Sequence, residues 1–222
     1  MPKDARSISE TVIRRMPVYH RYLKELIEDG VERVSSKELS GLTGFSASQI
    51  RQDLNNFGGF GQQGYGYNTK ALKDQVDKIL GIDKSYKSIV IGAGRLGQAI
   101  ARYNGFRDSG FNVISLFDIK DDIEDISGIK VRNMKDLENY IRDEGVDVAI
   151  ITVPREVCEE VADRVIDAGV KGIWNFAPYD LKGPEGIVVE NIRLNDSLLT
   201  LSLIHISEPT RQCCTSRMPS SA

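Results

Sequence analysis

Histidine and cysteine are scarce in this chain of 222 residues, which holds only two histidines and three cysteines. The cysteines, Cys158, Cys213 and Cys214, lack the spacing of a metal site or of a disulfide framework. Neither His20 nor His205 lies in a pattern typical of a catalytic or metal-binding imidazole. We therefore expect no metal site and no catalytic residue, and we expect Cys158 to be a small buried apolar side chain.

Long apolar runs are also missing, and none approaches the length of a membrane span. The amino-terminal residues lack the apolar core of a secretory signal. With 27% charged and 41% hydrophobic residues, the composition is that of an ordinary globular protein, and the length allows one large or two modest domains. These features predict a cytoplasmic protein without a membrane partner.

A glycine pattern at an abrupt change from strand-forming to helix-forming residues is the most informative motif. An apolar run ends at Ile91, and Gly92-x-Gly94-x-x-Gly97 follows at once. In a dinucleotide fingerprint, the first glycine permits a tight turn, the second lets the backbone approach a pyrophosphate, and the third lets the helix pack near the strand. The start of the helix then offers free N–H groups to the phosphates.

An acidic residue follows at the spacing that such a fingerprint requires. A second apolar run, from Asn112 to Phe117, ends in Asp118, which lies 21 residues beyond Gly97. A carboxylate at this position holds the ribose hydroxyls of NAD and repels the extra phosphate of NADP. The order of these features predicts an NAD(H) site, and the alternative is a purely structural turn in an α/β domain.

The amino-terminal part of the chain has the pattern of a helix-turn-helix unit. Helical periodicity covers residues 8–29, with Pro17 expected to bend or restart the helix. Ser35 or Ser36 is expected to cap a second helix, and Ser46 a third helix from Ala47 to about Phe57. That third helix buries Ile50 and Leu54 and turns outward a set of polar side chains suited to base edges and phosphates: Ser48, Gln49, Arg51, Gln52 and Asn55. The alternative is an ordinary polar helix surface.

Two neighbouring features favour DNA as the partner of this unit. Residues 57–67 interleave glycine with aromatics, which favours a hairpin such as the wing of a winged helix over a glycine-rich linker. Residues 1–24 carry six cations against two carboxylates, although the whole chain has a net charge of −3. This basic stretch includes Arg14 and Arg15, and its alternative interpretation is a solvated helix face.

Beyond the fingerprint, strands and helices alternate. Strands are expected at 113–117, 130–131, 146–153, 172–175 and 187–190, and helices at 134–144 and 155–168. This alternation predicts a parallel sheet with helices on both faces, and ligands of such sheets bind at the carboxyl ends of the strands. Two strand ends, Thr152-Val153-Pro154 and Asn175-Phe176-Ala177-Pro178, could line the nicotinamide half of a dinucleotide, or both could be turns punctuated by proline.

The sequence pattern changes twice near the carboxyl end of the chain. Residues 194–203 predict a last helix whose apolar face should pack on something, such as a partner chain. From about residue 204 the periodicity disappears, and the tail resembles the translated read-through of a sequencing adapter. We treat residues 204–222 as a non-native tail and leave them out of the fold.

Six separated motifs in this order resemble the redox-sensing transcriptional repressors of the Rex family, over residues 11 to 202. The motifs are Arg33-Val34-Ser35-Ser36-Lys37-Glu38-Leu39, Gln49-Ile50-Arg51-x-Asp53-Leu54, the 57–67 segment, Gly92-Ala93-Gly94-x-Leu96-Gly97, Thr152-Val153-Pro154 and Asn175-Phe176-Ala177-Pro178. The resemblance implies an α/β protein with an N-terminal winged helix-turn-helix domain, a Rossmann-type parallel-sheet domain and a domain-swapped C-terminal helix. It further implies a homodimeric repressor that binds a double-stranded DNA operator and leaves it when NADH binds.

The resemblance and the residue pattern together set the expected domains and sites. The domains are a winged-helix domain over 1–81, a Rossmann domain over 82–192, a dimer-exchange helix over 193–203 and the tail. Coenzyme contacts are expected from Gly92, Ala93, Gly94, Arg95, Leu96, Gly97, Asp118, Thr152, Val153, Pro154, Asn175, Phe176, Ala177 and Pro178, and from Tyr103 by resemblance alone. DNA contacts are expected from Arg14, Arg15, Ser35, Ser36, Lys37, Ser46, Ser48, Gln49, Arg51, Gln52, Asn55, Gln62, Gln63 and Tyr65.

The chain departs from the family pattern where Gln52 and the pair Gln62-Gln63 replace residues that are usually basic. Fewer cations imply fewer phosphate contacts and a shallower dependence of DNA affinity on salt.

Two rival functions stay open. An NAD-dependent dehydrogenase is disfavoured by the absence of a substrate domain and of a proton-transferring histidine. The other rival is a DNA-binding protein whose Rossmann domain binds coenzyme A or senses nothing.

Overall fold

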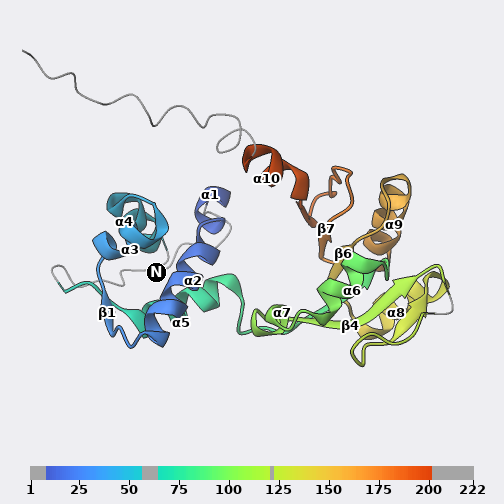
Figure 1. Cartoon of the computed structure of the whole chain (residues 1–222), viewed down its shortest axis with the longest axis horizontal. Helices are drawn as coiled ribbons and strands as arrows, with labels where there is room; N and C mark the ends of the chain where they lie inside the picture. The colour runs from blue at the N-terminus through green and yellow to red at the C-terminus, as the bar shows by residue number, and fades with distance from the viewer. Residues whose placement is uncertain (1–8, 57–64, 121–122, 202–222) are drawn as a thin grey trace, which may run out of the picture. The chain divides into compact units, whose positions relative to one another are not determined.

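The computed structural model describes residues 9–56, 65–120 and 123–201 (Figure 1). Its described residues divide into two compact units. The first, called the helical unit, lies within Met1–Ser85 and Asp108–Gly110. The second, called the α/β unit, lies within Tyr86–Arg107 and Phe111–Ala222.

The helical unit consists of short helices and one small antiparallel strand pair. Its elements in order are α1 (Glu10–Ile13), α2 (Met16–Glu28), β1 (Arg33–Val34), α3 (Ser36–Thr43), α4 (Ala47–Asn55), β2 (Tyr67–Asn68) and α5 (Thr69–Leu80). The predicted restart of the first helix is confirmed, because α1 ends before Pro17 and α2 carries this proline in its first turn. Strand β1 pairs with β2, with Val34 opposite Tyr67.

Local capping interactions set the bounds of the helix-turn-helix. The Ser35 hydroxyl accepts from the Glu38 amide at 3.1 Å, and the Glu38 carboxylate accepts in return from the Ser35 amide at 2.7 Å. Gly44 ends α3 with a φ of 75°, and the Ser46 hydroxyl caps α4. At α5 the side chain of Asn68 forms the cap by accepting from the Ala71 amide, and Thr69, the first residue of the helix, is buried.

One hydrophobic cluster joins the helices of this unit. Its fully buried members come from α2, α3, α4 and α5, which places the inward face of each amphipathic helix on a common core. They include Met16, Leu23, Leu39, Ile50, Leu54, Leu72 and Val76. Most of the segment predicted to form the wing, including Gln62 and Gln63, lies outside the described residues.

The α/β unit is built on a six-stranded parallel sheet, as the alternating pattern predicted. Its strands are β3 (Tyr86–Ile91), β4 (Phe111–Asp118), β5 (Val131–Asn133), β6 (Val148–Ile151), β7 (Gly172–Asn175) and β8 (Val188–Asn191). They lie in the order β5-β4-β3-β6-β7-β8, and every neighbouring pair is parallel. The chain therefore leaves β3 to one side for β4 and to the other for β6, which places a topological switch point at the end of β3.

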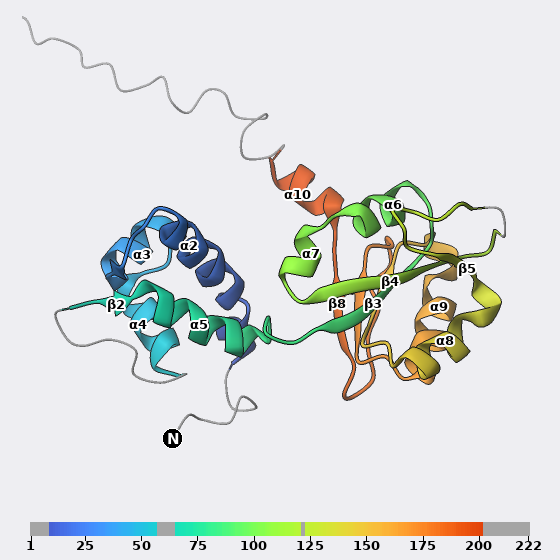
Figure 2. The same cartoon turned by 90° about the horizontal axis from the view of Figure 1, so that it is seen from below.

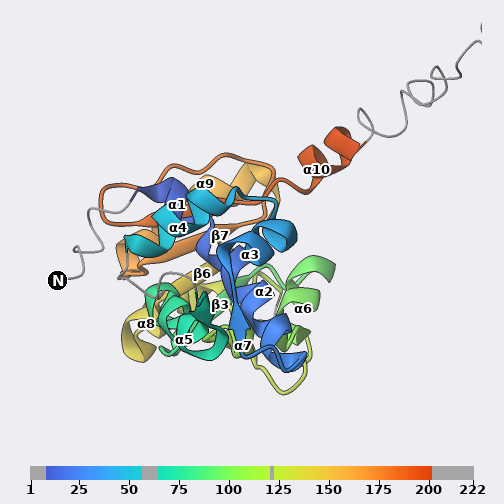
Figure 3. The ribbon, with the colours of Figure 1, turned by 90° about the vertical axis from the view of Figure 1, so that its left-hand side faces the viewer.

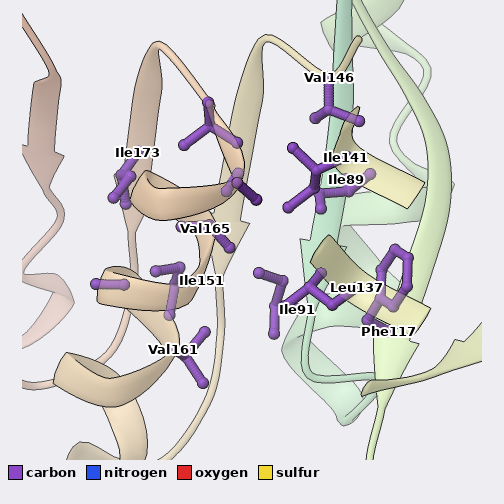
Figure 4. Close-up of a cluster of buried hydrophobic side chains, with 14 of the residues drawn as sticks. Ile89, Ile91, Phe117, Leu137, Ile141, Val146, Ile151, Val161, Val165 and Ile173 are labelled. Atoms are coloured by element: carbon purple, nitrogen blue, oxygen red, sulfur yellow. The ribbon is translucent and has the colours of Figure 1, made fainter. Parts of the chain in front are cut away.

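Helices cover both faces of the sheet (Figure 2). Alternate residues of β3 point to opposite faces, so Ile89 and Ile91 belong to one cluster and Val90 to the other. Helices α8 (Leu137–Glu144) and α9 (Arg155–Ala168) bury the first face, with Leu137 against Ile91 and Phe117 (Figure 4). Helix α6 (Arg95–Arg102) packs on the second through Ile100, and the short elements α7 (Gly105–Asp108) and η2 (Met134–Asp136) complete the layers.

Helix α10 (Leu194–Leu201) stands away from the sheet at the end of the described chain (Figure 3). Its apolar side chains face solvent, with Leu198 and Leu199 each more than 60% exposed and Leu194 and Leu201 about half exposed. A contiguous set of exposed leucines is unusual for a monomeric protein surface. Among the described helices, none is long and apolar enough to cross a bilayer.

The helical core gives a testable stability prediction. Leu23→Ala removes a side chain with no exposed surface and should lower the free energy of unfolding of the helical unit by about 2–5 kcal/mol. The control is Leu42→Ala, since Leu42 is 41% exposed and its truncation should change that free energy by about 0.5 kcal/mol or less. Urea denaturation followed by circular dichroism measures both, and equal effects of the two substitutions would contradict the assigned core.

Candidate functional site

A cavity of about 660 Å³ opens at the carboxyl ends of the central strands. Its walls come from the last residues of β3 and β4, from the residues that follow β3, β4, β6 and β7, from η2 and from the first three turns of α9. Most of the lining is apolar, with a few polar groups among it, which is typical of a small-molecule site. The lining residues are Ile91, Gly92, Gly94, Leu96, Phe117, Asp118, Ile119, Lys120, Met134, Thr152, Val153, Pro154, Val157, Glu160, Val161, Arg164 and Phe176.

The three glycines of the fingerprint meet different local constraints. Gly92 has a φ of 98°, and a Cβ placed on it would lie 2.9 Å from the carbonyl oxygen of Thr152. A Cβ on Gly97 would lie 1.9 Å from the carbonyl oxygen of Gly92, so helix and strand approach too closely for any side chain. Gly94 has nothing within 4 Å and lines the cavity. The fold therefore requires Gly92 and Gly97, whereas Gly94 leaves space for a bound group.

Asp118 is fixed against the glycine turn by two backbone hydrogen bonds. One carboxylate oxygen accepts from the Ala93 amide at 2.8 Å, and the other accepts from the Lys120 amide at 3.0 Å. These bonds hold the carboxylate at the end of β4, where it lines the cavity beside the turn. The remaining lone pairs suit hydroxyl donors, and the negative charge disfavours a phosphate at the same place.

Thr152 connects the end of β6 to the same turn. Its hydroxyl lies 3.0 Å from the carbonyl oxygen of Ile91 and 2.9 Å from that of Gly92, and it donates to this pair. The adjoining Val153 and Pro154 line the cavity, and α9 begins at Arg155. The structure thus brings Gly92, Asp118 and Thr152 together from three separate strands.

The Asn175–Pro178 segment differs from expectation, because only Phe176 lines the cavity. Asn175 is fully buried, and its amide nitrogen donates to the Tyr179 carbonyl at 2.6 Å and to the Asn191 side chain at 2.8 Å. Its amide oxygen accepts from the Ala177 backbone at 2.9 Å. Asn175 therefore shapes the loop that presents Phe176, while Ala177 is buried and Pro178 exposed outside the lining.

Tyr103 also lies outside the cavity lining, with 61% of its surface exposed. Its ring meets Phe106 edge-on with centroids 4.8 Å apart, and Phe106 meets Trp174 at 5.2 Å. Trp174 in turn meets Phe176 at 4.7 Å. A continuous row of aromatic rings thus joins Tyr103 to the cavity wall.

The remaining residues of the glycine fingerprint have different surroundings. Leu96 lines the cavity, whereas Ala93 and Gly97 are buried behind it and Arg95 is exposed.

One wall of the cavity was missed by the sequence reasoning. Val157, Glu160, Val161 and Arg164 recur at helical spacing on α9 and share the face that the cavity exposes. The Arg164 guanidinium donates hydrogen bonds to the Glu138 carboxylate at 2.6 Å and to the Met134 carbonyl oxygen at 2.7 Å. The first of these bonds lowers the pKa of Glu138. The i, i+3, i+4, i+7 spacing after Pro154 was a usable signal for this wall.

The outer face of the helix-turn-helix presents most of the side chains expected at DNA. Ser48, Arg51, Gln52 and Asn55 of α4 are exposed, as is Lys37 of α3, and Gln49 is half-buried. The Arg51 guanidinium donates to the Ser36 hydroxyl at 3.0 Å, which joins the two helices across this face. The hydroxyls of Ser35 and Ser46 already accept from backbone amides in their helix caps. Tyr65 is 72% exposed, and the Arg33 guanidinium lies over its ring.

The two neighbouring arginines at the start of α2 have different surroundings. Arg14 is exposed and pairs with Glu10 at 2.9 Å, which leaves it on the surface. Arg15 has a side chain only 14% exposed and donates to both carboxylate oxygens of Asp53, at 2.6 and 2.7 Å. The expectation that Arg15 contacts DNA therefore conflicts with its place inside the helical unit, where these donors are already used.

Other candidate chemistry is limited within the described part of the chain. It holds no group of three or more histidine, cysteine or acidic side chains placed to bind a metal ion. Cys158 is buried, as predicted, and desolvation raises the pKa of its thiol to about 11. His20 pairs with Asp77 at 2.7 Å in the helical unit.

Two family models match the chain. One is described as a CoA binding domain and matches residues 83–179, and the other is described as a putative DNA-binding protein N-terminus and matches residues 7–55. These ranges correspond to the sheet with its cavity and to the helix-turn-helix.

Two curated relatives match about nine-tenths of the chain. The redox-sensing transcriptional repressor Rex of Clostridioides difficile (strain 630) is 52% identical over 90% of this chain and 96% of its own length. Rex of Clostridium tetani is 52% identical over 90% of this chain and 95% of its own.

Solved structures agree with these relatives. A crystal structure of RSP in complex with beta-NAD+ and operator DNA has a TM-score of 0.85 and 51% identity, and covers 88% of this chain and 91% of that one. A structure of RSP in complex with beta-NADH has a TM-score of 0.82 and 48% identity, and covers 88% and 93%.

The glycine turn gives a prediction that distinguishes a glycine required by the fold from a glycine that leaves space for a ligand. Gly97→Ala places a methyl group against a backbone oxygen and should destabilise the α/β unit by on the order of 3 kcal/mol. Gly94→Ala is the matched control, because open space surrounds that position, and it should leave the midpoint of thermal unfolding close to that of the wild type. A thermal melt followed by circular dichroism distinguishes them, and an unchanged midpoint for Gly97→Ala would refute the close approach.

Proposed function

This chain belongs to the Rex family of redox-sensing transcriptional repressors, and we propose that it binds an operator on double-stranded DNA and leaves it when NADH binds. The coenzyme is NAD(H), and the protein acts as a regulator and not as an enzyme. Its site of action would be the bacterial cytoplasm, where the operator lies. The observation that carries the proposal is the junction of the glycine turn with the Asp118 carboxylate at the mouth of one cavity.

NAD(H) fits this junction better than the alternatives. The amides at the start of α6 would face the pyrophosphate above Gly94, and Asp118 would accept from the ribose hydroxyls. Coenzyme A and NADP carry a phosphate on that ribose, which the Asp118 carboxylate would repel. This charge argues for NAD(H) although one matching family model is described by coenzyme A.

The cavity wall near Phe176 is where the two redox states would be distinguished. Oxidised and reduced nicotinamide differ in ring charge and planarity, so only side chains next to that ring can respond to the difference. We assign this part to Thr152-Val153-Pro154 and to Phe176, which follow β6 and β7 and line the same cavity. Asn175, Ala177 and Pro178 support the Phe176 loop and do not contact the coenzyme in this proposal.

The DNA interface would centre on α4. In a helix-turn-helix the second helix enters the major groove, and here α4 carries exposed amide and guanidinium groups on its outer face. Arg51, Gln52 and Asn55 are suited to base edges or phosphates, and Lys37 and Arg14 to phosphates. Tyr65, whose side chain is 72% exposed, would add a contact to the DNA backbone. Gln62 and Gln63 lie outside the described residues, and their contacts with DNA stay a prediction.

A homodimer follows from the exposed leucines of α10. We propose that this helix packs on a second copy of the chain, which would bury Leu194, Leu198, Leu199 and Leu201. Two copies would present two α4 helices to a DNA site with matching symmetry. The coenzyme would then act on the relative orientation of the two copies, a form of allosteric coupling between separate sites.

The redox response is tested directly with DNA. The probe is a duplex selected in vitro with the wild-type chain, and its affinity is measured by fluorescence anisotropy without coenzyme, with NAD⁺ and with NADH. NADH should weaken binding by roughly 5- to 150-fold relative to NAD⁺, because a coupling free energy of about 1–3 kcal/mol is typical of allosteric proteins. Equal affinities under NADH and NAD⁺ would contradict the sensor.

The role of Asp118 is tested by coenzyme titration. Asp118→Asn removes the negative charge at nearly constant shape and should weaken NADH binding by roughly tenfold or more, because a hydrogen bond to a charged group contributes about 1.5–3 kcal/mol. It should also reduce the preference for NADH over NADPH. The control is Asp143→Asn on the exposed side of α8, which should bind NADH as the wild type does. Calorimetry measures all three proteins, and an unchanged NADH affinity in Asp118→Asn would refute the assignment.

A further inference from the structure

A carboxylate is buried on the inner face of the helix proposed to read DNA. Asp53 lies between Ile50 and Leu54 on α4 and is only 2% exposed. Acidic side chains are almost never buried without a partner, since the charged form loses its hydration. Here the Arg15 guanidinium supplies two parallel hydrogen bonds to the two carboxylate oxygens, at 2.6 and 2.7 Å. This bidentate geometry fixes the orientation of the guanidinium relative to the carboxylate as well as the distance between them.

The place of Arg15 on its own helix is not explained by local preference. It occupies the position just before α2, where the positive end of the helix dipole disfavours a cation. The interruption between α1 and α2, with Pro17 in the first turn, puts this residue at a corner of the backbone. From that corner the guanidinium reaches α4, which lies 38 residues away in the sequence. The partner on α4 is therefore what gives this residue its role in the fold.

Two aromatic residues complete the arrangement. The Tyr19 hydroxyl, one turn further along α2, donates to the same Asp53 carboxylate at 2.7 Å, and Tyr19 is 1% exposed. Burial and the neighbouring carboxylate raise the pKa of Tyr19, so its hydroxyl keeps the proton that it donates. Phe45, in the turn that precedes α4, meets the Tyr19 ring edge-on at 5.8 Å and lies under the Arg15 guanidinium at 5.9 Å.

We propose that Arg15 is a positioning residue for DNA recognition, which with Tyr19 sets the rotation and depth of α4 through Asp53 and does not itself contact DNA. This inference rests on the proposed DNA-binding function. Because Asp53 and Arg51 are on one helix, a rotation of α4 about its axis would displace every outward side chain at once. Screening by salt acts weakly on a buried ion pair, so the position of α4 holds at salt concentrations that weaken phosphate contacts.

The test separates positioning from direct contact by the salt dependence of DNA binding. Neutralising a cation that contacts a phosphate reduces the slope of log affinity against log salt concentration by about 0.9. A residue that acts only through α4 leaves this slope unchanged and instead reduces the preference for the selected sequence. The probes are the in vitro selected duplex and a scrambled duplex of the same composition, each titrated at several salt concentrations.

Three variants are compared with the wild type. In Arg15→Gln, the preference for the selected duplex over the scrambled one should fall by roughly 5- to 150-fold, which is the range expected when one base contact is misplaced. The salt slope of this variant should equal that of the wild type. Tyr19→Phe removes one buried hydrogen bond without changing any charge, and it should shift the same preference in the same direction by a smaller factor. Lys37→Gln is the positive control, because it removes an exposed cation of α3 that the proposed function assigns to a phosphate, and it should reduce the slope by about 0.9.

The outcomes are distinguishable from a failure of the proposed function. A wild-type chain that does not prefer its selected duplex refutes the function itself. A reduced salt slope in Arg15→Gln, with equal losses on both duplexes, makes Arg15 a phosphate contact and overturns the inference. Unchanged sequence preference in Tyr19→Phe also overturns it, and this variant decides the matter if circular dichroism shows that Arg15→Gln does not fold.

Discussion

The close approach of Gly97 to the carbonyl oxygen of Gly92 is the constraint on which the ligand site of the α/β unit depends. Because no side chain fits between them, α6 lies directly against the end of β3, and its first amides remain beside the opening of the turn. The Thr152 hydroxyl, just after β6, then donates to the Gly92 carbonyl, and the Asp118 carboxylate of β4 accepts from the neighbouring Ala93 amide. The cavity exists because three strand ends converge on one loop that has almost no side chains of its own.

Features with a local physical cause were predictable from the sequence. Strand β7 and helix α9 have the predicted bounds, since each is a short apolar or amphipathic segment between clear breaking residues. The caps at Ser35 and Ser46 follow from the preference of hydroxyl side chains for free helix amides. The parallel sheet was predictable because alternation of strands and helices leaves few other arrangements.

Features set by long-range partners were not predictable. Arg14 and Arg15 are adjacent and chemically identical, yet one is on the surface and the other is bound to a carboxylate on another helix. The sequence predicted Asn175 as a ligand contact because it ends a strand. Its amide group instead forms hydrogen bonds with the backbone of the loop that follows. The α9 wall of the cavity became visible only when the sheet order placed that helix beside the glycine turn. Burial decides each of these cases, and burial depends on the whole fold.

Trp174 is the only tryptophan of the chain, and it sits in the row of rings that ends at Phe176 on the cavity wall. Its fluorescence therefore originates in the α/β unit alone. A reduced nicotinamide absorbs light in the spectral range in which indole emits, so a coenzyme beside Phe176 would quench this emission by energy transfer, whereas the oxidised form does not absorb there. The arrangement supplies a built-in, label-free optical distinction between the two redox states of the ligand.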